Sequence, residues 1–265
     1  MIMPEENNHM IYQKLPVVFL SIIASEKKGS TNSEIASYLL NHLDEMQNIG
    51  ISEMAKRCHV ANSSISRFCK EIGLQDFNEL KELLLEQNIY FEKQSNQMTS
   101  KERLLDYCNH VKNSIDEVAL SIDMDKIHKL CQDISHYSTI ASFGLLKAEG
   151  AALSLQADLL MQGKQIYTNI NYQEQMDYIF HASANDLIII FSYTGSYFDY
   201  QEIRANKKQL VKPKIYMITG NDLEYPDFID ETIIFKSKHD QGSHPYQLQF
   251  IESIIAQEYE SVKSY

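Results

Sequence analysis

The stretch ISEMAKRCHVANSSISRFCKEIGL, from Ile51 to Leu74, predicts two short helices joined by a tight turn. Ser52 is the expected N-cap of the first helix, because a hydroxyl there can accept from a free backbone N–H. The turn is predicted at residues 59–60, with Val60 closing the gap between the helices, and Gly73 is expected to end the second helix. Apolar residues recur at intervals of three and four and predict one buried stripe on each helix: Met54, Ala55, Cys58, Ile65, Phe68, Cys69 and Ile72.

The opposite face of the second helix is polar and carries cations. It presents Asn62, Ser63, Ser64, Ser66, Arg67 and Lys70, and the first helix adds Lys56 and Arg57. A helix that lies in the DNA major groove needs short hydrogen-bonding groups near base edges and cations near phosphates. From Met54 to Lys70 the chain has cations and no carboxylate. A solvated helix pair in some other helical domain fits the same spacing, so both interpretations stay open on the pattern alone.

The run from Ala55 to Leu84 resembles the N-terminal helix-turn-helix domain of RpiR-family bacterial transcription regulators. The matching positions are Ala55, Val60, Ile65, Arg67, Phe68, Cys69, Lys70, Ile72, Gly73, Leu74, Phe77, Glu79, Leu80 and Lys81. Three positions depart from the family: Ala61 replaces the usual capping serine, Ser64 the usual threonine and Asp76 the usual glycine. We expect Asn62 to substitute as the cap of the second helix. The resemblance implies that the polar face described above binds a double-stranded DNA operator.

Length and composition indicate a globular protein of about two domains. The chain has 265 residues and a net charge of −12, which argues against non-specific coating of nucleic acid. An apolar run long enough to span a membrane is absent, and the N-terminus does not resemble a secretory signal, so we expect a cytoplasmic protein. The cysteines have no metal-site spacing and are predicted to be reduced, buried thiols: Cys58, Cys69, Cys108 and Cys131. No cofactor or metal is expected.

Three segments follow from the pattern: a DNA-binding domain over residues 1–92, a polar linker over 93–102, and a second domain over 103–265. In the second domain, helices are predicted at 104–122, 124–135, 147–162, 173–182, 197–210 and 245–262, and strands at 138–143, 165–168, 186–191, 214–219 and 232–235. This alternation predicts an α/β fold whose five-stranded parallel sheet is flanked by helices. Ligands of such folds bind beyond the carboxyl ends of the strands.

A loop rich in hydroxyl groups follows the third predicted strand: Ser192, Tyr193, Thr194, Gly195 and Ser196. Hydroxyls and backbone N–H groups at the start of a helix suit an anion, in particular a phosphate. An ordinary N-cap with a tight glycine turn fits the same residues, so the pattern alone leaves both interpretations open. The loop after the first strand, which begins at Gly144, is a weaker candidate because it has one glycine.

Residues 138–260 resemble a sugar isomerase (SIS) domain, a fold that typically binds phosphosugars. Ser192 and Gly195 match the family's second loop, Thr194 keeps a hydroxyl, and Tyr197 replaces a small hydroxyl residue. The segment MITGN, residues 217–221, also resembles the family. In the first loop Gly144 keeps the first glycine, but Leu146 replaces the second and Ala148 replaces the serine. The resemblance therefore implies a phosphate cradle of which the first half is degraded.

Two further residues are candidate ligand contacts. Lys147 could supply a compensating cation, although a solvated helix lysine is the plainer interpretation, and His244 stands where family members often have an arginine. The resemblance implies a transcription regulator, not an enzyme, that responds to a sugar-phosphate effector and forms a homodimer or homotetramer. One alternative is a regulator whose SIS domain only dimerises. Another is a sugar-phosphate isomerase, for which Glu174, His181 and His244 are the available bases.

Overall fold

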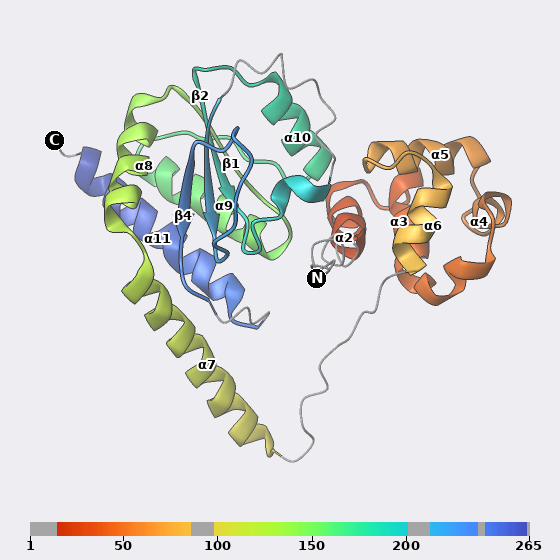
Figure 1. The fold of residues 1–265 in the computed structure, drawn as a ribbon, viewed down its shortest axis with the longest axis horizontal. Helices are drawn as coiled ribbons and strands as arrows, with labels where there is room; N and C mark the ends of the chain where they lie inside the picture. The colour runs from red at the N-terminus through yellow and green to blue at the C-terminus, as the bar shows by residue number, and fades with distance from the viewer. Residues whose placement is uncertain (1–14, 86–97, 201–212, 238–241, 264–265) are drawn as a thin grey trace, which may run out of the picture. The chain divides into compact units, whose positions relative to one another are not determined.

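The computed structural model describes residues 15–85, 98–200, 213–237 and 242–263 (Figure 1). They form two compact units, of which the first is helical and the second is α/β. We describe each unit by itself.

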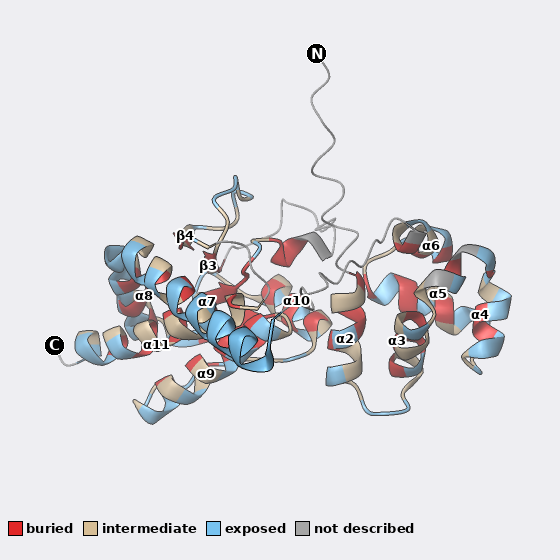
Figure 2. Ribbon diagram, turned by 90° about the horizontal axis from the view of Figure 1, so that it is seen from below, coloured by how far each residue is buried: buried red, intermediate tan, exposed pale blue. Residues whose placement is uncertain are grey.

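The first unit contains five α-helices and one 3₁₀ helix within residues 15–85. These are α2 (Leu15–Ser25), α3 (Thr31–Asn41), η1 (Leu43–Asn48), α4 (Ile51–Arg57), α5 (Asn62–Glu71) and α6 (Phe77–Leu85). The predicted apolar stripe of the helix pair is buried except at Cys58, which is half-buried. It joins a single core with residues of α2, α3 and α6, and Figure 2 shows the buried face of each helix turned inward.

The turn between α4 and α5 is held by backbone hydrogen bonds. The N–H of Val60 donates to the Ala55 carbonyl at 2.9 Å, and the N–H of His59 donates to Lys56 at 3.2 Å. This pattern requires a left-handed residue after the helix, and His59 adopts it with φ 55°. The second helix ends in the same way at Gly73, whose φ is 88°. The predicted turn and the predicted helix end are therefore both found.

The predicted N-caps are wrong. Helix α4 begins at Ile51 after Gly50, so Ser52 lies inside its first turn rather than at the cap. Helix α5 begins at Asn62 after Ala61, and no side chain caps it. Asn62 does not substitute for the missing serine because its side chain donates to the Ser52 hydroxyl at 3.0 Å instead.

The second unit begins with a long helix. A capping box between Thr99 and Glu102 starts α7 (Ser100–Ser121), so residues 100–102 of the predicted linker are helical. Residues 93–97 of that linker lie outside the described part. The elements that follow along the chain are α8 (Met124–His136), β1 (Thr139–Gly144), α9 (Lys147–Met161), α10 (Tyr172–His181), β2 (Asp186–Phe191), the 3₁₀ helix η2 (Tyr197–Tyr200), β3 (Lys214–Thr219), β4 (Glu231–Ile234) and α11 (His244–Lys263).

The sheet has four parallel strands in the order β1-β2-β3-β4, not the five predicted. The predicted strand at 165–168 is reduced to one bridge between Tyr167 and Ala141, with two backbone hydrogen bonds of 2.8 Å. This segment leaves the ladder beside β1 after a single pairing, which is too short to count as a strand. The predicted helix at 197–210 is described only over its first four residues, which are 3₁₀, and the rest lies outside the described part.

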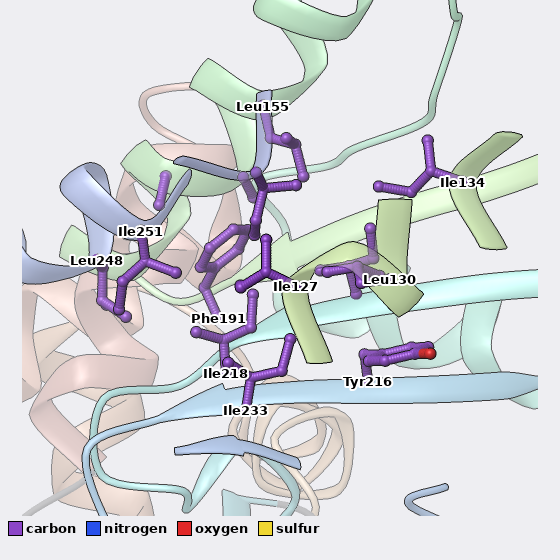
Figure 3. Packing of buried hydrophobic residues seen from close by; sticks show 14 of the residues in the cluster. Ile127, Leu130, Ile134, Leu155, Phe191, Tyr216, Ile218, Ile233, Leu248 and Ile251 are labelled. Atoms are coloured by element: carbon purple, nitrogen blue, oxygen red, sulfur yellow. The ribbon is translucent and has the colours of Figure 1, made fainter. Parts of the chain in front are cut away.

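The main core of this unit lies between the sheet and the helices α8, α9 and α11. Figure 3 shows Ile127 and Leu130 of α8, Phe191 of β2 and Ile251 of α11 meeting there. The opposite face of the sheet is covered at β1 by α10, where the Phe143 ring meets Tyr178 with centroids 5.5 Å apart. In β1, β2 and β3 every residue after the first is buried, as expected for a parallel sheet with covered faces, whereas in β4 only Ile233 is buried.

Among the described helices, we find none with the length and apolar character needed to cross a membrane. All four cysteines are free thiols. Burial raises the pKa of Cys69 and Cys131 to about 12 and that of Cys58 to about 11, so these thiols stay protonated at neutral pH. The prediction that all four are buried is wrong for Cys108, which is exposed on α7 because the first half of that helix packs against little else.

Candidate functional site

The exposed face of α5 carries the residues predicted to contact DNA. Asn62, Ser63, Arg67 and Lys70 are exposed, and Ser64 and Ser66 are partly exposed. The opposite stripe of this helix is fully buried in the core. The packing of α5 thus fixes which of its faces is free to enter a groove, and the short polar residues lie toward its N-terminal end.

The two cations of α4 differ in their surroundings. Lys56 is exposed. The guanidinium of Arg57 donates to Glu53 at 2.8 Å, to Glu45 at 2.7 Å and to the Tyr38 hydroxyl at 3.1 Å. The hydrogen bond to Glu53, followed by those to Tyr38 and Glu45, raises the pKa of Arg57. A DNA phosphate would have to compete with these partners for Arg57.

Arg67 is more available for contact. It approaches Glu71, one turn away, at 3.5 Å, and both side chains are largely exposed, so this pair is weak in water. Glu71 also accepts a hydrogen bond of 2.9 Å from Asn32 of α3. The exposed face of α5 therefore has the carboxylate of Glu71 beside it, which the local sequence from Met54 to Lys70 does not include.

The second candidate site lies where β1 and β2 end. The register pairs Gly144 with Phe191, so the loops that follow the two strands leave the sheet side by side. The chain runs from β1 out to the bridge at Tyr167 and then back across to β2. This reversal is a topological switch point, the position where open α/β sheets bind ligands.

The second loop, residues 192–196, is fixed by the end of β3. The carbonyl of Tyr193 accepts from the N–H of Gly220 at 3.0 Å and from the Thr219 hydroxyl at 3.3 Å, and Asn221 donates to the Thr194 carbonyl at 2.8 Å. Gly195 has φ 73°. The hydroxyls of Thr194 and Ser196 lie 2.6 Å apart; Thr194 is exposed, whereas Ser192 and Ser196 are buried.

Tyr197 lies in the interior rather than on the rim of the loop. It is 1% exposed, and its hydroxyl donates to Gln175 at 2.6 Å. Gln175 in turn donates to the Gly144 carbonyl at 2.9 Å. Tyr197 was predicted to contact the ligand, but its hydroxyl is committed to this bridge between the two strand ends.

In the first loop, Leu146 has a backbone conformation that is usual only for glycine. Leu146 has φ 51° and ψ −108°, a conformation that residues other than glycine rarely adopt. It stands at the position of the second glycine in the family pattern. Gly144 is needed for a different reason, since a Cβ there would lie 2.7 Å from the backbone of Ala148 in α9. Lys147 opens α9 and is exposed.

The last predicted contact, His244, is brought against the second loop. It is the first residue of α11, and its ring stacks on Tyr193 with centroids 4.4 Å apart. The Tyr193 hydroxyl and the Ser237 hydroxyl lie 2.5 Å apart, and Ser237 donates to Gln247 at 2.8 Å. Sequence reasoning missed Gln175, Ser237 and Gln247, because these residues have no local motif and reach the site only through the fold.

Comparisons with known proteins agree with this geometry. Residues 17–92 match the helix-turn-helix domain of the rpiR family. An uncharacterised HTH-type transcriptional regulator of Caldanaerobacter subterraneus subsp. tengcongensis is 26% identical over 136 residues, which are 48% of this chain and 47% of that protein. A second HTH-type regulator, from Providencia stuartii, is 22% identical over 197 residues, 71% of this chain and 70% of that protein.

The chain thus spans about half the length of the Caldanaerobacter relative that it matches. Among solved structures, the Vibrio vulnificus NanR protein complexed with ManNAc-6P aligns with 95% of this chain and 92% of its own, at 14% identity and a TM-score of 0.51. That likeness shows a shared fold. Residues 17–92 therefore match the helix-turn-helix domain of the rpiR family, and the chain as a whole shares the fold of that NanR protein.

Proposed function

We propose that this protein is a bacterial transcription regulator that binds a double-stranded operator through α5. The observation that carries the proposal is the packing of α5, which buries Ile65, Phe68 and Cys69 and leaves Arg67 and Lys70 exposed beside short polar residues. In a groove, the short residues near the helix N-terminus are placed for base edges and the cations for phosphates. The family of the domain and the names of its relatives support the same function.

We further propose that a sugar phosphate binds at the ends of β1 and β2 and modulates operator binding. The second loop supports this, because it places the hydroxyls of Ser192, Thr194 and Ser196 at the switch point. The NanR structure, which shares the fold, contains a phosphorylated sugar. An effector acts only if it prefers one arrangement of the regulator over another. We expect that arrangement to be a homodimer or a homotetramer, which would present two recognition helices to two half-sites.

Fluorescence anisotropy tests the DNA proposal. The full chain is titrated against its own upstream duplex and a scrambled duplex at physiological salt. We expect tight binding to the native duplex, and we expect Arg67→Ala to weaken it by about tenfold or more, since one specific arginine contact contributes roughly 1–3 kcal/mol. Arg103→Ala is the matched control, because this exposed arginine lies on α7, outside the helix-turn-helix domain. Equal affinity of Arg67→Ala and the native chain would contradict the assigned role of α5.

The isomerase alternative has less support. A sugar-phosphate isomerase needs an acid–base group at the substrate carbon. The exposed His181 directs Nδ1 to the Asp177 carbonyl at 2.7 Å on α10, whereas His244 stacks on Tyr193. These two imidazoles serve different elements and do not form a pair. Turnover of a hexose phosphate by the pure protein, lost in His244→Ala, would favour the enzyme instead.

A further inference from the structure

Glu252 of α11 is a fully buried carboxyl group, with 0% of the residue exposed. One of its oxygens, Oε2, accepts from the Gln249 amide at 2.8 Å and from the Ser253 hydroxyl at 3.4 Å. The other, Oε1, is buried and accepts no hydrogen bond from any described residue. An ionised carboxylate is costly in such a place, because both of its oxygens are acceptors that need donors.

The neighbour of Glu252 across the helix interface is a second carboxyl group. Gln162, the residue that follows α9, donates to the Ala256 carbonyl of α11 at 2.8 Å and so fixes the register of the two helices. Asp158 and Glu252 each lie four residues before these positions, on the same faces of their helices. The side chains of Asp158 and Glu252 are within hydrogen-bonding distance of each other. Two carboxyl groups can form such a bond only if one of them carries a proton.

A proton on Glu252 satisfies both carboxyl groups. The Oε1 hydroxyl then donates to the Asp158 carboxylate, while Oε2 still accepts from Gln249. Asp158 is half-buried, so it stays ionised at a lower cost than Glu252. Burial, followed by the charge of Asp158 and the hydrogen bond to it, raises the pKa of Glu252 to about 8. A hydrogen bond from a neutral acid to a carboxylate is charge-assisted and therefore strong.

The other groups packed against α11 are neutral. Helix α7 buries no titratable side chain, and α8 buries one, the Cys131 thiol. Burial raises the pKa of Cys131 to about 12 and that of Tyr259, two turns on along α11, above its usual range. On α9, the buried carboxyl of Glu149 lies nine residues before Asp158, about 13 Å along the helix. Within the described part of the chain, Asp158 is the charged group that acts on Glu252.

We propose that Asp158 and Glu252 share one proton across the interface between α9 and α11, and that loss of this proton loosens the two helices. Two adjacent ionised carboxylates would repel each other at this buried interface. Helix α9 begins directly after the first loop, and α11 begins at His244, which stacks on Tyr193 of the second loop. The proton therefore makes the packing of the helices beside both loops dependent on pH. This inference does not depend on the proposed function.

The bound proton determines how stability depends on pH. The pKa of Glu252 is raised to about 8 in the folded chain from an ordinary value of 4.5, which the unfolded chain retains. The folded state therefore binds about one more proton between these values, and stability falls as the pH rises through them. The contribution is complete below the lower value and is lost above the higher one. Burial raises the pKa of Glu149 to about 7, which acts in the same direction, so a variant has to isolate Glu252.

Urea denaturation of the full chain, from about pH 5 to about pH 9, tests the shared proton. Glu252→Gln is the main variant, because an amide has the shape of the protonated acid and its N–H can donate to Asp158. We expect the slope of the free energy of unfolding against pH to correspond to about one proton fewer in the variant. The variant should be the more stable chain at the alkaline end. Glu260→Gln, at an exposed position of the same helix, is the control and should leave the slope unchanged.

Equal slopes for the native chain and Glu252→Gln would overturn the proposal, because Glu252 would then be ionised in the folded chain. Asp158→Asn tests the partner, since it removes the neighbouring charge and the carboxylate acceptor. We expect the loss of stability to begin about one pH unit lower in this variant. The same onset as in the native chain would place the proton on Glu252 alone and overturn the sharing.

Infrared spectroscopy decides the matter if Glu252→Gln does not fold. A protonated carboxyl group has a C=O stretch that is separate from the bands of a carboxylate. We expect such a band in the native chain to disappear near pH 8, the raised pKa of Glu252, and to disappear at lower pH in Asp158→Asn. A native spectrum without a band that titrates there would overturn the proposal.

Discussion

The two loops at the switch point differ in composition and in backbone conformation. The second loop, residues 192–196, contains the hydroxyls of Ser192, Thr194 and Ser196 and a glycine with φ 73°, and the end of β3 holds it in place. The first loop, residues 145–149, has Leu146 and Ala148 where the SIS pattern predicts glycine and serine, and Leu146 adopts a backbone with φ 51°. The first loop therefore has a backbone conformation suited to glycine at a position that holds leucine. The backbone conformation of a loop and the residue types in it can therefore vary independently.

The largest loss of stability is expected from a substitution at Gly144, where the first loop meets α9. Gly144→Ala would place a Cβ 2.7 Å from the Ala148 backbone, which cannot move without shifting the helix. We expect a loss of about 2–4 kcal/mol in the free energy of unfolding, measured by urea denaturation. Gly150→Ala is the matched control, since nothing lies within 4 Å of its Cβ and a helical glycine-to-alanine change should stabilise by about 0.5–1 kcal/mol. Equal effects of the two changes would contradict the close packing.

The next effect tests whether the two loops are coupled. Tyr197→Phe removes the hydroxyl that donates to Gln175 at 2.6 Å and leaves a buried amide oxygen without that donor. We expect a loss of about 1–3 kcal/mol. Gln175→Leu combined with Tyr197→Phe should cost less than the two single losses added together, because the hydrogen bond that joins the two side chains is lost only once. A double variant that is as unstable as the two single losses added together would show that Tyr197 and Gln175 act independently.

A smaller effect is expected at the glycine of the second loop. Gly195→Ala forces a side chain into a left-handed backbone and overlaps the Tyr225 hydroxyl. Because that hydroxyl is the end of a side chain, it can move more easily than a helix backbone, and we expect a loss of about 1–2 kcal/mol. Thermal melting of Gly195→Ala beside Gly144→Ala measures the difference. A larger loss at Gly195 would reverse the comparison between the loops.

The smallest expected effect is an increase in stability, caused by a substitution at Leu146. Leu146→Gly replaces the residue at φ 51° with the one that tolerates this backbone. The relief of strain exceeds the extra entropy of glycine in the unfolded chain, so we expect a stabilisation of up to about 1 kcal/mol. Leu145→Gly should destabilise instead, which makes it the control in the same chemical denaturation experiment. If both changes lower the free energy of unfolding, the packing of the Leu146 side chain stabilises the protein by more than its strained backbone destabilises it.

Much of the fold follows from the sequence, because periodicity determines which residues are buried. The stripe of α5, the glycine stop at Gly73 and strands β1 to β4 all lie within a residue or two of their predicted positions. The N-caps were predicted less well, because Ser52 and Asn62 are local candidates whose use depends on where the helix starts. Strand 165–168 was overpredicted, since a favourable local pattern cannot show how long pairing with a neighbour lasts.

The candidate sites were predictable only in part. The second loop is contiguous in sequence, so its hydroxyls were visible at once. The bridge from Tyr197 through Gln175 to Gly144 joins residues up to 53 positions apart and has no signature. The partners of Arg57 were hidden in the same way, since Tyr38 and Glu45 reach it from other helices. Contacts between residues that are far apart in the sequence cannot be predicted from the spacing of neighbouring residues.

Helix α5 begins at Asn62 with no side-chain cap. The positive end of its dipole and its first N–H groups therefore lack an internal acceptor of the kind that Thr99 gives to α7. A phosphate of the operator placed at that end would supply the acceptor that the chain does not. In that arrangement, α5 would acquire the cap at its N-terminal end only in the protein–DNA complex.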